Sequence, residues 1–177
     1  MLGDRPGEIR CKVSILNKKG ENLVGILEDN GSSQIILCHG FRSSKENGVL
    51  TSLSSKFLSM RFSTFRFDFS GSGESEGYFQ YGSYWKDAED LSSVVTYWRD
   101  HGRKVDALVG HSKGSVEYRV MKDSLKERFN TDMETAMKCI PNNCSVLTVH
   151  GSNDETVNCK EAGAFDKLIP NPDYCWC

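Results

Sequence analysis

The sequence lacks a surplus of either charge and any long apolar run. Its 177 residues include 22 Lys and Arg against 24 Asp and Glu, a formal net charge of −2. Without a basic surplus the chain has nothing to neutralise phosphates, so we expect no nucleic-acid partner and no membrane partner. No stretch approaches the roughly 18 apolar residues of a membrane span. Residues 1–10 are charged and lack the apolar segment of a secretory signal, so we expect a cytoplasmic protein.

Paired metal-binding and cofactor motifs are also lacking. The seven cysteines are an odd number, and none forms the CxxC or His/Cys spacing of a zinc site. Gly71 and Gly73 follow a strand, as in a dinucleotide-binding loop. The third glycine, Gly77, comes one position too late for G-x-G-x-x-G. We therefore expect reduced thiols, no metal and no cofactor.

Strand and helix patterns alternate along the chain. Hydrophobic residues make up 38% of it, enough for one domain with a small core. The pattern predicts strands over residues 12–17, 23–27, 34–38, 63–69, 107–109 and 145–149, and helices over residues 47–61, 84–101, 116–130, 132–140 and 160–168. The first two strands lie on either side of Asn17-Lys-Lys-Gly20, which predicts an opening hairpin. The alternation along the rest of the chain is typical of a mostly parallel α/β sheet with helices on both faces.

Three segments also predict which side chains face the core. Phe65, Phe67 and Phe69 alternate along their strand, so they point to one face. The strand at 107–109 is short and continuously apolar, which predicts a buried strand. Helical spacing over residues 84–101 predicts an inward stripe of Trp85, Ala88, Leu91, Val95 and Trp98.

The segment Gly110-His-Ser-Lys-Gly114 directly follows the predicted strand at 107–109 and fits G-x-S-x-G. In that pattern a tight strand-to-helix turn holds the serine hydroxyl clear of the sheet, and small flanking residues let neighbouring backbone approach. Ser112 is the predicted nucleophile, and the amide of Lys113 is predicted to face the developing oxyanion. The alternative is that Ser112 is an ordinary turn serine.

Two further segments supply what an acyl-transfer site needs. His39-Gly-Phe41 ends an earlier buried strand, where the amide of Phe41 is the candidate for the second oxyanion donor. Asp154 follows the strand at 145–149, where a carboxylate can orient a catalytic histidine. Alternatively, Asp154 only caps the helix that follows it.

Four segments taken together resemble the α/β-hydrolase superfamily. They are His39-Gly-Phe41, Arg66-Phe-Asp-Phe-Ser-Gly-Ser-Gly-Glu-Ser75, Gly110-His-Ser-Lys-Gly114 and Val149-His-Gly-Ser-Asn-Asp154, and they occur in the family's order. The sequence looks most similar to the serine aminopeptidase-like branch, which includes plant hydrolases and bacterial feruloyl esterases. The resemblance implies that Asp68 and the glycines after it support the site from behind.

The sequence departs from the family pattern in two places. Only residues 111–144 separate the serine motif from the strand before Asp154, where the family has a further strand and a cap. Only residues 155–177 follow Asp154, and none of them is the histidine that the family places after its acid. The resemblance therefore implies an internally deleted and C-terminally truncated hydrolase. A serine without a base stays protonated and is a poor nucleophile.

We therefore expect a single, incomplete α/β-hydrolase domain over residues 1–177, with the sixth and last strands missing. The resemblance implies impaired hydrolysis of a small-molecule ester or amide through an acyl-serine. The alternative is a non-catalytic hydrolase-like protein that binds a ligand or a partner. The implied catalytic residues are Ser112 and Asp154, the oxyanion amides are those of Phe41 and Lys113, and the supporting residues are His39, Gly40, Gly110, His111, Gly114 and Asp68.

Overall fold

The computed structural model describes residues 9–31, 33–80, 84–111, 138, 140–141, 144–150, 167 and 172–176. The chain divides into two compact units, residues 1–113 and 114–177, and each is described here by itself. The helices predicted over residues 116–130, 132–140 and 160–168 fall almost entirely outside the described residues. The prediction of a single domain stays a prediction.

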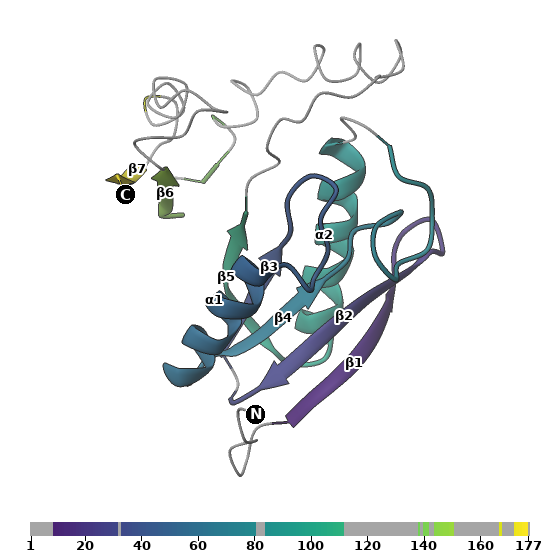
Figure 1. Cartoon of the computed structure of the whole chain (residues 1–177), viewed down its shortest axis with the longest axis horizontal. Coiled ribbons are helices and arrows are strands. Elements are labelled where there is room, and N and C mark those ends of the chain that lie inside the picture. Colours follow the sequence, from purple (N-terminus) through teal and green to yellow (C-terminus); the bar gives the residue numbers. More distant parts are fainter. Residues whose placement is uncertain are drawn as a thin grey trace. The chain divides into compact units, whose positions relative to one another are not determined.

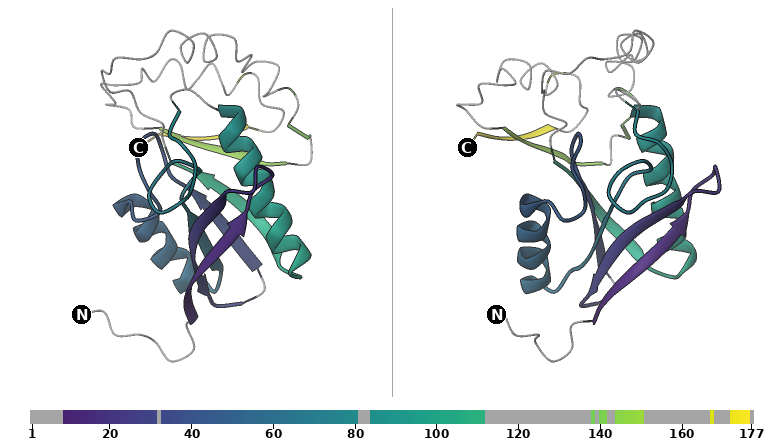
Figure 2. Two further views of the ribbon diagram at one scale, coloured as in Figure 1. Left: turned by 90° about the vertical axis from the view of Figure 1, so that its right-hand side faces the viewer. Right: turned by 45° about the vertical axis from the view of Figure 1, so that its right-hand side comes forward.

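The first unit is built around a five-stranded mixed sheet. Its strands are β1 (Ile9–Leu16), β2 (Asn22–Asp29), β3 (Ser33–Cys38), β4 (Ser63–Phe67) and β5 (Lys104–Gly110), in the order β1-β2-β4-β3-β5. β1 and β2 form the predicted antiparallel hairpin, whereas β4, β3 and β5 run parallel. Helix α1 (Gly48–Ser59) covers one face and α2 (Tyr84–Asp100) the other (Figures 1 and 2).

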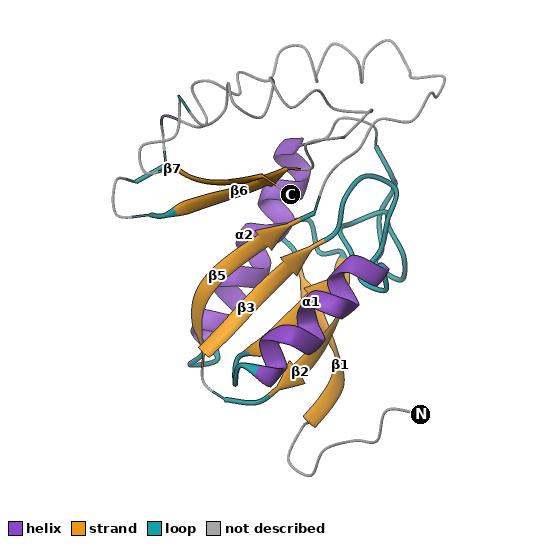
Figure 3. Cartoon of the chain, turned by 60° about the vertical axis from the view of Figure 1, so that its left-hand side comes forward, coloured by secondary structure: helices purple, strands orange, loops and turns teal. Residues whose placement is uncertain are grey.

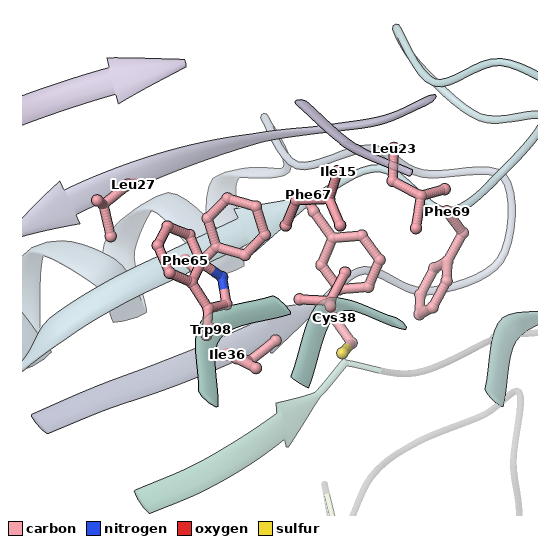
Figure 4. Packing of buried hydrophobic residues seen from close by; sticks show 10 residues of the cluster. Ile15, Leu23, Leu27, Ile36, Cys38, Phe65, Phe67, Phe69 and Trp98 are labelled. Carbon is pink, nitrogen blue, oxygen red and sulfur yellow. The ribbon is translucent and has the colours of Figure 1, made fainter. Parts of the chain in front are cut away.

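The larger core cluster fills the face of the sheet under α2. Phe65 and Phe67 stack with their ring centroids 6.0 Å apart, and Trp98 from α2 meets Phe65 edge-on at 5.0 Å (Figure 4). Phe69 belongs to the same cluster, so the predicted alternation of the three phenylalanines is confirmed. A smaller cluster of Ile35, Leu37 and Leu50 lies under α1.

Helix α2 confirms part of the predicted stripe, because Trp98 is buried and Leu91 and Val95 pack against the core. The buried residues are Lys86, Asp90, Val94 and Trp98, each four positions apart. Trp85 is 62% exposed and Ala88 is also exposed, so the prediction was wrong for both. The helix is rotated because the charged ends of Lys86 and Asp90 bind main-chain atoms of the loop after β4. Those hydrogen bonds satisfy two buried charges and leave Trp85 outside.

Strand β5 was predicted to be buried, and this prediction was wrong. Within the described part of the first unit β5 is an edge strand, paired on one side only, with β3. Ala107 is exposed and Leu108 is 53% exposed. An apolar run identifies a strand, but it does not show that both neighbouring strands and both faces are covered.

The second unit contains a parallel pair of strands, β6 (Val146–His150) and β7 (Pro172–Trp176), shown in orange in Figure 3. β6 confirms the strand predicted over residues 145–149. The pattern predicts no strand over residues 172–176, and the structure adds one there. Pro172 is its first residue, a position where a missing N–H is tolerated. No helix among the described residues is long and apolar enough to cross a membrane.

Candidate active site

The two predicted oxyanion segments begin side by side at the carboxyl edge of the sheet. Cys38 ends β3, Gly110 ends β5, and the two residues are paired in register. The amide of His111 then donates a hydrogen bond to the carbonyl of Cys38 at 3.0 Å. The first residue after β5 is therefore held beside the end of β3. Ser112, Lys113, Gly114 and Asp154 lie outside the described residues, so their roles stay predictions.

Both ring nitrogens of His39 form hydrogen bonds with nearby main-chain atoms. The residue is 4% exposed, and its Nε2 accepts a hydrogen bond from the amide of Phe69 at 3.2 Å. Nε2 must then be unprotonated, so Nδ1 carries the proton and donates it to the carbonyl of Gly40 at 2.7 Å. Both ring nitrogens are used in the neutral ring. His39 is a structural residue of the motif and not a base that could serve Ser112.

Phe41 begins a tight turn after β3. Its ring is half-buried and lies 5.5 Å from the ring of Phe79, which comes from the loop before α2. Arg42, the next residue, has φ +49°, a left-handed conformation that costs a non-glycine residue free energy. The turn is therefore held in place by surrounding contacts and does not follow from local preference.

Asp68 supplies the largest set of these contacts. Its side chain is fully buried just after β4. Oδ1 accepts a hydrogen bond from the amide of Lys45 at 2.6 Å, and Oδ2 accepts one from Lys45 Nζ at 2.5 Å and one from the amide of Glu74 at 2.9 Å. Asp68 therefore joins the segment after Phe41 to the glycine-rich loop after β4, which contains Gly71 and Gly73. Its supporting role in a catalytic site stays a prediction.

The glycine-rich loop can wrap Asp68 only because two of its residues lack side chains. A Cβ on Gly73 would lie 2.2 Å from Asp68 Oδ2, and one on Gly71 would lie 2.2 Å from the carbonyl carbon of Tyr78. Both glycines have positive φ, +51° and +81°. By contrast, a Cβ on Gly110 would meet none of the described residues within 4 Å.

Sequence reasoning missed three buried charged residues that hold this region together. Lys45 is 2% exposed. Lys86 Nζ donates to the carbonyls of Ser70 and Tyr78 at 3.0 and 2.7 Å, and Asp90 accepts from the amide and hydroxyl of Ser70 at 2.9 and 2.7 Å. Lys86 and Asp90 could have been found from their four-residue spacing with Val94 and Trp98. Nothing in the sequence distinguishes Lys45 from a surface lysine.

The charges around Asp68 are fixed over the neutral pH range. Burial acts to lower the pKa of Lys45, but hydrogen bonds with Asp68 and Glu74 outweigh it and raise that pKa above its ordinary value. The hydrogen bond from Lys12, followed by that from Lys45, lowers the pKa of Glu74 to about 2. These groups hold structure through permanent charge and are unsuited to proton transfer at pH 7.

His101 is also a poor candidate for a base. His101 precedes β5, so the length of that strand separates it from Gly110. Its Nδ1 lies 2.8 Å from the carbonyl of Tyr97, and its ring stacks on that tyrosine. His111 adjoins Ser112 in the chain, and its Nδ1 is buried with no hydrogen-bond partner among the described residues. Among the described residues, no cluster of His, Cys, Asp and Glu could hold a metal ion.

Comparison with known proteins supports the fold and not a specific activity. No family model matches the sequence, and no curated protein matches it. Solved structures do match the fold. Est1E from Butyrivibrio proteoclasticus with ferulic acid bound has a TM-score of 0.80 at 17% identity, covering 93% of this chain and 89% of that one. The Pyrococcus furiosus esterase Pf2001 has a TM-score of 0.77 at 18% identity, covering 99% and 87%.

A third similar structure is XC6422 from Xanthomonas campestris, an α/β serine hydrolase without a lid. Its TM-score is 0.67 at 17% identity, covering 98% of this chain and 85% of that one. These matches agree with the mixed sheet, its strand order and the helices on its two faces. The chain therefore has an α/β-hydrolase-like fold, as the sequence predicted.

Proposed function

We propose that this chain carries a serine acyl-transfer site in which Ser112 attacks the carbonyl of an ester or amide. The observation that supports this best is the hydrogen bond from the His111 amide to the Cys38 carbonyl. It brings the start of the serine motif next to the turn that contains Phe41. Two amides can stabilise the same developing oxyanion only if the ends of the two strands that precede them lie next to each other.

The proposed reaction forms a bond between Ser112 Oγ and the carbonyl carbon. The carbonyl oxygen becomes the oxyanion, and the amides of Phe41 and Lys113 stabilise it. Collapse breaks the bond to the leaving alcohol or amine, which takes up a proton from water, while the hydroxyl proton of Ser112 passes to solvent. Water then hydrolyses the acyl-serine to the acid and restores the serine.

We propose a weak activity, because neither His39 nor His101 is available as the base. His39 has both ring nitrogens in hydrogen bonds, and His101 lies at the other end of β5. Asp154 is the proposed acid that would orient a histidine. A triad enzyme that loses one member retains roughly a 10³–10⁴-fold acceleration from its oxyanion hole and binding. We expect activity of that residual kind.

The proposed substrates are esters with a large apolar or aromatic acyl group. Tyr78 is 86% exposed, Phe79 46% and Trp85 62%, so these aromatic side chains are not explained by burial in the core. The ring of Phe41, whose amide is the proposed oxyanion donor, contacts Phe79. Any acyl carbon held by that amide therefore lies close to aromatic surface. The ferulic acid bound to Est1E is an aromatic acid of this kind.

A fluorophosphonate probe tests the proposal on the purified chain. We expect slow, stoichiometric labelling that mass spectrometry locates on Ser112. Ser112→Ala should abolish labelling, and the matched variant Ser115→Ala should keep it. A folded chain that shows a cooperative melt but no labelling would contradict the proposal and favour the non-catalytic binding role.

A further inference from the structure

Lys45 is the most deeply buried lysine of the described residues, and it lies four residues after Phe41. Its main-chain amide and its side-chain ammonium both bind the carboxylate of Asp68, one on each oxygen, at 2.6 and 2.5 Å. A residue held at both its backbone and the end of its side chain has little freedom to move. The segment 41–45 begins three residues after the end of β3, and its end is held at Asp68.

Several other contacts make this segment a rigid unit. The amide of Asn47 donates to the carbonyl of Ser44 at 3.0 Å, and the Asn47 side chain donates to Ser43 Oγ at 3.0 Å. The same side chain caps α1, accepting from the amide of Val49 at 2.9 Å. Because the segment is rigid, a displacement of Lys45 would also move the turn at Phe41 and Arg42.

Asp68 is equally immobile on its side of the pair. Its amide donates to the carbonyl of Val24 at 2.9 Å, and its carbonyl accepts from Ser75 Oγ at 2.6 Å. Gly73 closes over the carboxylate, with no space for a Cβ. The carboxylate therefore gives the turn a fixed anchor that is connected directly to the central strands β2 and β4.

The charges of the pair matter as well as the geometry. A buried carboxylate near a developing oxyanion would oppose the build-up of negative charge, because the interior screens charges poorly. The Lys45 ammonium lies on Asp68 Oδ2 and also 2.7 Å from Glu74 Oε2. It offsets the negative charge of both groups at a position facing the turn.

We propose that Lys45, anchored on Asp68, is a positioning residue that sets the orientation of the Phe41 amide as an oxyanion donor. Lys45 acts through the turn and does not touch the substrate. This inference rests on the proposed acyl-transfer function. The sequence pattern does not identify Lys45, and the proposed role explains why its charge is buried inside a loop.

The test compares Lys45→Met with Lys12→Met. Both variants remove a lysine that binds Glu74, but Lys12 is exposed and does not contact Asp68. The first readout is hydrogen exchange of the amides in residues 39–47, which requires no activity. We expect exchange in Lys45→Met to be faster by about tenfold or more, as expected when an opening becomes easier by about 1.4 kcal/mol. Lys12→Met should exchange like the parent chain.

The second readout is the rate of fluorophosphonate labelling at saturating probe, separated from probe affinity. A small displacement of a catalytic group can cost about 10²-fold, so we expect Lys45→Met to label about 10- to 100-fold more slowly with unchanged affinity. If Lys45→Met does not fold, the double variant Lys45→Met/Asp68→Asn replaces it, because it leaves no buried charge unpaired. The same changes are expected in the double variant.

The two readouts separate the two proposals. Unchanged exchange in a folded Lys45→Met or double variant overturns the positioning role, as does an equal labelling loss in Lys12→Met. A parent chain that is not labelled at Ser112 overturns the proposed function. In that case the exchange measurement still decides whether Lys45 and Asp68 immobilise the turn.

Discussion

The carbonyl of Cys38 accepts a hydrogen bond from the amide of His111 at 3.0 Å, one residue beyond the last paired position of β3 and β5. This contact extends the parallel ladder past both strands. It fixes the distance between the turn at Phe41 and the beginning of the serine motif. The candidate site therefore depends on the register of two neighbouring strands more than on either motif alone.

This hydrogen bond predicts different outcomes for two substitutions at the same position. His111→Pro removes the donor, so we expect the two strand ends to separate and fluorophosphonate labelling to be lost. His111→Ala keeps the main-chain donor and removes a ring whose Nδ1 has no hydrogen-bond partner in the described part of the chain, so labelling should stay within a fewfold of the parent rate. Equal labelling of the two variants would show that the contact does not matter.

Gly73 and Gly48 offer a matched test of the loop around Asp68. A methyl group at Gly73 would overlap Asp68 Oδ2, and φ is +51° there. We expect Gly73→Ala to lower the free energy of unfolding by about 1–3 kcal/mol, as overpacking and strain do. Gly48 begins α1 with open space around its Cα, so Gly48→Ala should be neutral or stabilising by up to about 1 kcal/mol. Urea denaturation measures the free energy of unfolding of both variants. A loss well below about 1 kcal/mol in Gly73→Ala would contradict the close packing of the loop around Asp68.

The rotated face of α2 makes a prediction about its two tryptophans. Trp98 packs against Phe65 in the core, so Trp98→Ala should cost about 3–5 kcal/mol of stability. Trp85 is 62% exposed, and Trp85→Ala should change stability by less than about 0.5 kcal/mol. Thermal or urea unfolding of both variants checks the order. A larger loss of unfolding free energy for Trp85→Ala than for Trp98→Ala would show that Trp85 faces the core, as the sequence pattern predicted.

The pair formed by Asp29 and Arg103 predicts a pH dependence of stability. Hydrogen bonds from Arg103 lower the pKa of Asp29 from 3.8 to about 2, against the opposing effect of burial. Because the folded pKa is depressed, the stabilisation is fully present above pH 4 and is lost as the pH falls through 2. We expect Asp29→Asn to cost about 1 kcal/mol at pH 7, less than the full shift implies because the pair is partly solvated.

The measurement is urea unfolding of the parent chain and Asp29→Asn between pH 7 and pH 2. The stability difference between them should be constant down to about pH 4 and then shrink, following the protonation of Asp29. A difference that grows on acidification would contradict the assigned partner.

The first unit could be predicted where one local rule decides the structure. Alternation fixed the face of Phe65, Phe67 and Phe69, and the turn over residues 17–20 indicated the hairpin. Asn47 caps α1 at the position where the predicted helix began. These features depend on neighbouring residues alone, which is why a single sequence was sufficient.

Features that depend on distant partners were not predictable in the same way. The burial of Lys45 requires Asp68, twenty-three residues away. The orientation of α2 depends on two hydrogen bonds with the loop after β4, one donated by Lys86 and one accepted by Asp90, and not on its most apolar residues alone. Similarly, the exposure of Leu108 depends on which strands flank β5.

The central claim is that the hydroxyl of Ser112 lies beside the amide of Phe41. A crystal structure of the chain after reaction with a fluorophosphonate tests it most directly. We expect phosphorus on Ser112 Oγ and a phosphoryl oxygen within about 2.7–3.1 Å of the Phe41 nitrogen. A phosphoryl oxygen directed away from that amide, or a Ser112 inside a regular helix, would contradict the account.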